Sequence, residues 1–251
     1  MGIDRMKKMM QIFRAAVWET LRSFTDKWFW LAAVATVIFL WLGIGTESYI
    51  MLQSSEFPVD KRELLQNSLM SESTSLSLPA LAALPAAAMA LTEVKTGIVR
   101  SKVFRVGRRA WRIGKLAACA VSAVLSQMMG IVAFVGILSI LECRNGCIVP
   151  SAVENGVIGS MIGAHLLAAV IFACFGAAMA MLTGIGASAY VAPMAACFTM
   201  KLLGSRFFLE TPYIDPTEWL SGNEFALRLL WMLLAATMCL FDLALRKDSA
   251  K

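Results

Sequence analysis

Apolar residues gather into six long runs along the chain, separated by polar segments. The runs cover residues 28–44, 76–91, 116–141, 157–182, 187–203 and 225–241. A helix needs about 20 mostly apolar residues to cross the hydrocarbon core of a bilayer, and most of the runs are close to that length. The pattern predicts six membrane-spanning helices within one transmembrane domain that comprises residues 1–251.

The composition supports this interpretation. Hydrophobic residues make up 59% of the chain and charged residues 16%, and the mean hydropathy is +0.69. Soluble domains contain about 25% charged residues and fewer apolar ones. We therefore expect an all-α integral membrane protein, in which each backbone polar group in the lipid is satisfied within a helix.

Two of the six runs, 76–91 and 187–203, look short for a membrane span by strict hydropathy. The first also contains Pro79 and Pro85, and proline removes a backbone donor and favours a kink. We expect these two helices to be bent or to border a cavity.

The run 157–182 is rich in small residues, which permit close helix packing. Four of them, spaced by four, share one face, and two glycines lie beside it: Gly156, Ser160, Ala164 and Ala168, with Gly159 and Gly163. The spacing predicts that this face packs tightly against a neighbouring helix.

Residues 1–27 show helical amphipathicity. Apolar side chains recur every three or four positions, at Ile3, Met6, Met10, Phe13, Val17, Leu21 and Phe24. This spacing is typical of an amphipathic helix that lies at the membrane interface. The alternative is a polar lead-in to the first span.

The distribution of charge gives the orientation. The six-span topology places 17 of the 23 Lys and Arg residues on one side, namely those of 1–27, 93–115 and the C-terminal tail. Basic residues favour the cytoplasmic side, so both termini are expected in the cytoplasm and the chain in the plasma membrane. The net charge of +6 is thereby explained without a nucleic-acid partner.

Two extracytoplasmic connections carry further signals. In 46–74, Pro58 is followed by a segment that is predicted to form a short helix. In 142–155, Cys143 and Cys147 flank an Asn-Gly turn signal, and this compartment permits a disulfide. Two free thiols are the alternative, and they fit the four-residue spacing better because that spacing constrains the bridge geometry.

The segment 93–115 is the densest basic stretch, with eight of the 23 Lys and Arg residues. It also contains apolar side chains that a solvated helix would leave exposed. We therefore expect a helix that packs against another protein. A solvated loop that obeys the positive-inside rule is the alternative.

This segment resembles the corresponding part of ABC-2 type permeases. An acidic residue and a glycine follow the second run, then arginines, and a lysine opens the third run. The residues that carry the resemblance are Glu93, Gly97, Arg105, Arg108, Arg109 and Lys115. The resemblance implies that 93–115 is a cytoplasmic coupling helix that docks into a separate ATP-binding cassette subunit.

The resemblance also implies a type V exporter-like architecture. It includes an interfacial helix, six spans and a broken extracytoplasmic segment before the last span, here 207–219. The chain has no phosphate-binding loop of the form G-x-x-x-x-G-K-[ST], so ATP and Mg are expected in the partner and this chain is not expected to be an enzyme. A transport pathway further implies a second permease subunit, as a homodimer or a heterodimer.

Among such permeases, the length and small loops look most like those of peptide-antibiotic (lantibiotic or bacitracin type) immunity and export systems. Few polar groups lie within the runs, which suits an amphipathic cargo such as a peptide antibiotic, a drug or a lipid. His165 and Lys201 are candidate pathway residues because charged groups within spans are often functional. The alternatives are a hydrogen-bonded packing role for His165 and snorkelling of Lys201 to the headgroups.

Two other classes of membrane protein enter the comparison. A non-catalytic module, such as a substrate-capturing subunit or a sensor, would not need a coupling segment. An intramembrane serine protease would need a serine and a histidine in contact, and the order of His165 and Ser188 in the chain disfavours that pair.

Overall fold

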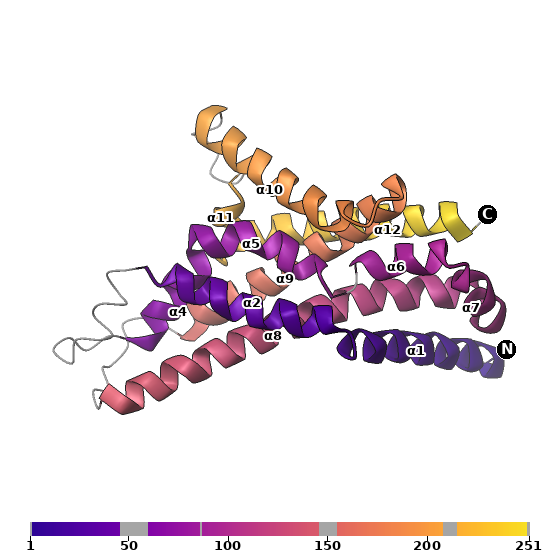
Figure 1. Ribbon diagram of the computed structural model, residues 1–251, viewed down its shortest axis with the longest axis horizontal. Coiled ribbons are helices and arrows are strands. Elements are labelled where there is room, and N and C mark those ends of the chain that lie inside the picture. Colours follow the sequence, from indigo (N-terminus) through magenta and orange to yellow (C-terminus); the bar gives the residue numbers. More distant parts are fainter. Residues whose placement is uncertain (1, 46–59, 86, 146–154, 208–214, 250–251) are drawn as a thin grey trace.

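The computed structural model describes residues 2–45, 60–85, 87–145, 155–207 and 215–249. These residues form helices and no strand (Figure 1). The helices are α1 Gly2–Phe24, α2 Lys27–Gly43, α4 Lys61–Met70, α5 Glu72–Ala83, α6 Ala87–Lys95, α7 Ile98–Val106, α8 Arg108–Asn145, α9 Asn155–Thr183, α10 Ser188–Phe207, α11 Pro216–Trp219 and α12 Glu224–Ser249. The expected all-α fold is confirmed for this part of the chain.

Three of the described helices are long and apolar enough to cross a membrane. They contain the segments Arg108–Leu141, Gly156–Thr183 and Glu224–Arg246. A fourth is added if Ala16–Phe24 and Lys27–Gly43, which are bent by 64° relative to each other, count as one span. These helices are compatible with a membrane protein, whereas the predicted count of six is not reached by this criterion.

The remaining predicted spans depart from single long apolar helices. Run 76–91 is divided between α5 and α6, with Pro85 at the break. Run 187–203 lies in α10, which also contains Lys201 and Arg206. A cavity of about 400 Å³ is lined by Leu84 and Pro85 at the break and by Tyr190 of α10, so both segments border a cavity, as predicted.

Helix α9 lies at the centre of the bundle and contacts α5, α6, α8, α10 and α12. Its alanines pack with no exposed surface at Ala164, Ala169, Ala177 and Ala178, and Ala168 is also buried. Of the small-residue face that was predicted to pack closely, Ala164 and Ala168 are therefore in the core, whereas Ser160 is partly buried and Gly156 is exposed. A second core cluster joins α2, α4 and α8 through Leu40, Leu69 and Phe134.

The predicted amphipathic helix is present as α1, and it packs along α8. Its apolar stripe is not covered by the rest of the described protein, because Met10, Phe13 and Val17 are exposed. An outward apolar stripe is what a helix needs if it rests in the membrane interface. The polar face therefore turns toward α8.

Both chain ends and α7 lie at one end of the elongated molecule, and α4 lies at the other (Figure 1). At the first end, Arg112 of α8 donates a hydrogen bond to Asp242 of α12 over 2.8 Å. The charge pattern had placed these segments on one side, and the fold brings them together.

Several predictions concern the other end of the molecule. The short helix after Pro58 is confirmed as α4, where Asp60 caps the N-terminus by accepting a hydrogen bond from the Arg62 N–H over 2.9 Å. Of the predicted broken segment 207–219, residues 208–214 lie outside the described residues, and α11 follows them. The side chain of Cys143 and all of Cys147 also lie outside the described part, so the disulfide stays a prediction.

Candidate functional site

The basic segment 93–115 folds as three pieces instead of the single helix that we expected. It comprises the end of α6, the whole of α7 and the start of α8. Gly97 and Gly107 make the two turns with φ angles of 71° and 89°, in a region that glycine adopts without steric cost. The segment is therefore not one continuous helix, because α7 is a separate short helix between two glycine turns, and its coupling role stays a prediction.

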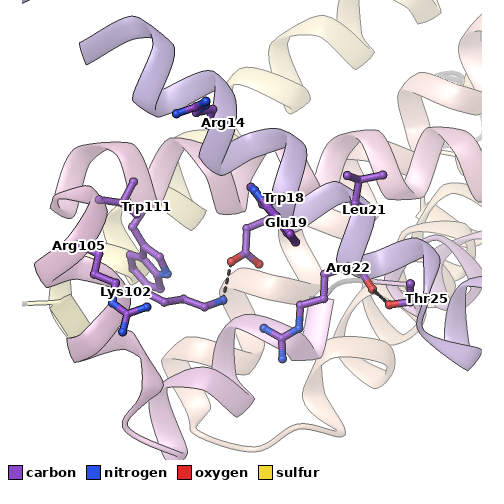
Figure 2. A pocket seen from close by; sticks show the side chains of 10 residues that line it. Arg14, Trp18, Glu19, Leu21, Arg22, Thr25, Lys102, Arg105 and Trp111 are labelled. Atoms are coloured by element: carbon purple, nitrogen blue, oxygen red, sulfur yellow. Dashed lines mark hydrogen bonds and ion pairs between the residues drawn. The ribbon is translucent and has the colours of Figure 1, made fainter. Parts of the chain in front are cut away.

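A cavity of about 790 Å³ lies between α1 and the α7–α8 corner. Arg14 and Trp18 of α1 line one side, and Arg105 and Trp111 line the other (Figure 2). The walls thus combine aromatic rings with guanidinium groups. Arg105 was predicted as a docking residue, and the structure places it on this cavity.

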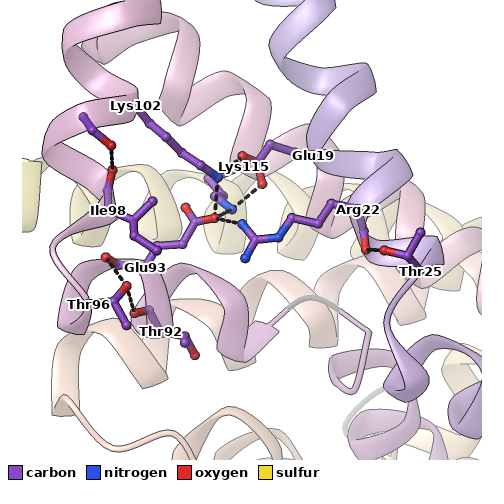
Figure 3. A network of polar contacts seen from close by, with 10 residues as sticks. Glu19, Arg22, Thr25, Thr92, Glu93, Thr96, Ile98, Lys102 and Lys115 are labelled. Atoms are coloured by element: carbon purple, nitrogen blue, oxygen red, sulfur yellow. Dashed lines mark hydrogen bonds and ion pairs between the residues drawn. The ribbon is translucent and has the colours of Figure 1, made fainter.

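Glu93 is the centre of a buried ion network next to the cavity. Its side chain is 2% exposed. One of its oxygens, Oε1, accepts hydrogen bonds from Arg22 Nη1 over 2.5 Å and from Lys102 Nζ over 2.6 Å, and lies 2.9 Å from Lys115 Nζ. Figure 3 shows these three cations converging on the one carboxylate.

Glu19 of α1 supplies the second carboxylate of the network. It accepts hydrogen bonds from Lys102 and from Lys115, each over 2.5 Å. Lys115 is only 4% exposed, and the two carboxylates are its ion-pair partners. The network of Glu19, Glu93, Arg22, Lys102 and Lys115 therefore joins α1, α6, α7 and α8.

The sequence indicated only part of this network. Glu93 and Lys115 were singled out, and the structure brings them together. Glu19, Arg22 and Lys102 were missed, although Glu19 and Arg22 lie off the apolar stripe of α1. Opposite charges on that polar face were the available signal, but periodicity does not say which helix the face meets.

Opposing effects act on the pKa of Glu19, which lies on α1 and outside the three apolar helices. Burial alone would raise the pKa of this carboxyl. The attraction of Lys115 and the hydrogen bonds from Lys102 and Lys115 outweigh burial and hold the pKa below its ordinary value of 4.5. A lowered pKa means that the charged carboxylate stabilises the fold above the ordinary pKa, and that this contribution is lost as the pH falls toward the lowered value.

We expect the substitution Glu19→Gln to reduce the loss of stability on acidification below pH 4.5, because the variant has no carboxylate to protonate at this site. The measurement is the unfolding temperature of the purified protein in detergent as a function of pH. Glu63→Gln, at an exposed position of α4, is the control and should keep the wild-type profile. An unchanged profile for Glu19→Gln would contradict the assigned role of Glu19.

The remaining docking candidates lie on the surface. Arg105, Arg108 and Arg109 are all exposed, and Phe104 beside them is 93% exposed. Gly97 forms the turn before α7, and a Cβ added there would meet no atom within 4 Å. The three arginines and this exposed aromatic ring are thus close together in the chain at the α7–α8 corner.

The two pathway candidates lie apart. His165 is buried on α9 beside Thr36, Ser77 and Gln127, and neither ring nitrogen has a hydrogen-bond partner among the described residues. The described residues therefore provide no hydrogen bond for the packing role that was considered for His165. Lys201 of α10 pairs instead with Glu72 of α5.

Ser188 does not meet His165. Its hydroxyl group donates a hydrogen bond to the Ile185 carbonyl over 2.6 Å and lies 2.7 Å from the Thr183 hydroxyl. The described residues also contain no group of three or more His, Cys, Asp or Glu side chains that could hold a metal ion.

No protein-family model matches the chain, and a search of curated proteins gives no match. The ion network, the exposed tip of α7 and the cavity beside them are therefore the features from which a function can be inferred.

Proposed function

We propose that this chain is the permease subunit of an ATP-driven transporter of the ABC-2 type, and that α7 transmits motion from a separate ATP-binding cassette subunit. In this proposal α2, the α5–α6 pair, α8, α9, α10 and α12 are the six spans. Both termini and α7 face the cytoplasm, as the excess of basic residues at that end favours.

The observation that carries the proposal is the exposed tip of α7 on a firmly anchored base. Phe104 is 93% exposed, and Arg105, Arg108 and Arg109 follow it in the chain. Aromatic residues and arginine are enriched where proteins meet. An exposed ring of this kind at the cytoplasmic end is expected to enter a groove of the partner.

The base of α7 supplies the mechanical connection. Lys102 of α7 binds Glu93 of α6 and Glu19 of α1, and Lys115 of α8 binds the same two carboxylates. A force on α7 would therefore move α6, α8 and α1 together. The break between α5 and α6 gives the second span a place to bend, which suits a switch between inward-open and outward-open states.

The other parts of the transporter lie outside this chain. ATP and Mg would be held by the cassette subunit, and a second permease subunit, identical or different, would complete the pathway. The resemblance to peptide-antibiotic permeases favours an amphipathic cargo such as a peptide antibiotic, a drug or a lipid.

The double substitution Phe104→Ser with Arg108→Gln tests the proposal. We expect the tagged wild-type chain, purified from its native membrane, to bring down an ATP-binding cassette protein identified by mass spectrometry. The double variant should retain at least about tenfold less of it, because losing a central aromatic contact and a charged contact at an interface typically weakens binding by that much or more.

A matched control removes the same kinds of group elsewhere at this end of the molecule. Leu243→Ser with Arg246→Gln changes one exposed apolar residue and one exposed arginine of α12, and it should leave the association unchanged. If the Phe104 variant retains the cassette protein fully, the coupling role of α7 is wrong. If the wild-type chain brings down no such protein, a non-catalytic membrane module becomes the better interpretation.

A further inference from the structure

The cavity between α1 and the α7–α8 corner has the features of a ligand site. Its volume of about 790 Å³ falls within the range of about 300–1,000 Å³ that is usual for small-molecule sites. Trp18 and Leu21 of α1 and Val106 of α7 give it apolar walls. An occupant therefore needs an apolar part of some size.

The same cavity carries an excess of positive charge. Arg14, Arg22, Lys102 and Arg105 line it, against one carboxylate, Glu19. The ion network satisfies Arg22 and Lys102. Arg14 and Arg105 form no ion pair with any described residue, so two guanidinium groups remain available to an anion.

Trp111 adds a donor on the α8 side of the cavity. The residue is 3% exposed, and its indole N–H has no acceptor among the described residues. A buried donor without a partner is costly, because it has lost its hydrogen bonds to water. The nitrogen is covered by its neighbours, so an anionic oxygen that displaces the covering side chain would supply the missing acceptor.

The position of the cavity on α1 indicates where the occupant comes from. Trp18 and Leu21 line the cavity and also belong to the exposed apolar side of α1. If that side rests in the membrane interface, the cavity opens at the depth of the lipid headgroups, where tryptophan is enriched. Basic pockets at the cytoplasmic ends of membrane helices bind anionic headgroups.

We propose that this cavity binds an anionic phospholipid of the cytoplasmic leaflet. Arg105 and Trp111 hold the phosphate on the α7–α8 wall, Arg14 adds attraction from α1, and the glycerol and upper acyl carbons lie against Trp18 and Leu21. The lipid would thereby bind α1 to the corner of α7 and α8. This proposal does not depend on the identity of the partner that docks on Phe104.

Lipid titration by native mass spectrometry tests the proposal. The purified chain in detergent is titrated with phosphatidylglycerol and, separately, with phosphatidylcholine that has the same acyl chains. We expect tight binding of phosphatidylglycerol alone. The double variant Arg14→Gln with Arg105→Gln should weaken this binding by about 30-fold, the effect of losing two basic groups near an anionic lipid.

A matched double variant separates this site from general surface charge. Arg108→Gln with Arg109→Gln removes two neighbouring exposed arginines that do not line the cavity, and it should keep the wild-type affinity for phosphatidylglycerol. Trp111→Phe removes the indole donor and keeps the ring, and it should weaken binding several-fold. Thermal unfolding of each variant shows whether the fold is intact.

Four results would overturn the lipid site. Phosphatidylcholine binding as tightly as phosphatidylglycerol would remove the role of the charge. If the Arg14/Arg105 variant bound phosphatidylglycerol with the wild-type affinity, the lipid site would lie elsewhere. Inorganic phosphate binding as tightly as the lipid would assign the cavity to a soluble anion. Loss of a co-purifying cassette protein in that variant, with unchanged lipid binding, would assign the cavity to protein docking.

Discussion

Replacing Glu93 with alanine is expected to lower the free energy of unfolding by about 3–5 kcal/mol, the usual effect of removing one partner from a buried ion pair. Glu93 is 2% exposed and faces three cations. Without it, Arg22, Lys102 and Lys115 are left with Glu19 as the only carboxylate of the network. The measurement is denaturant or thermal unfolding of the purified protein in detergent, followed by tryptophan fluorescence.

The charge balance of the network gives this prediction a strict control. The double variant Glu93→Ala with Lys115→Met keeps Arg22, Lys102 and Glu19, so the network has an excess of one positive charge, as in the wild type. We expect it to be more stable than Glu93→Ala alone, and such non-additivity is the signature of directly interacting residues. Glu224→Ala, which breaks an exposed pair with Arg228, should change stability little. Additive effects of the two network substitutions would contradict the proposed contact.

The helices were largely predictable because the hydrophobic period is a local property of the sequence. The spacing in 1–27 predicted α1, and Pro85 in 76–91 predicted the break before α6, whereas Pro79 lies inside α5. The turns at Gly97 and Gly107 were not predicted, since a basic stretch with interspersed apolar residues also fits one helix. Their positive φ angles are visible only in the folded backbone.

The network shows why a site is harder to predict than a helix. Glu93 and Lys115 were singled out from their place in the chain. Their partner Glu19 lies far from them in sequence, and it meets them only because α1 packs along α8. Lys201 gives a second example, because its partner Glu72 belongs to a segment for which no contact with α10 could be inferred.

The glycines of α9 show that close packing contacts are also hard to predict from the sequence. Gly159 and Gly163 were noted beside the small-residue face, yet a Cβ added at either would meet no atom within 4 Å. The close approach occurs at Gly176, where a Cβ would lie 2.2 Å from the Ala189 carbonyl oxygen of α10. The sequence shows where small residues occur, whereas the contact depends on the place where α10 crosses α9.

The substitution Gly176→Ala is therefore expected to destabilise the protein by about 3 kcal/mol or more, at the upper end for overpacking of a core, because the obstacle is the α10 backbone and not a flexible side chain. Gly163→Ala, the same change in the same helix, should raise stability by about 0.5–1 kcal/mol, since alanine favours a helix and no neighbour obstructs it. Unfolding temperatures in one detergent compare the two. A stabilising effect at both positions would contradict the close crossing of α9 and α10, because helix propensity alone would then explain both results.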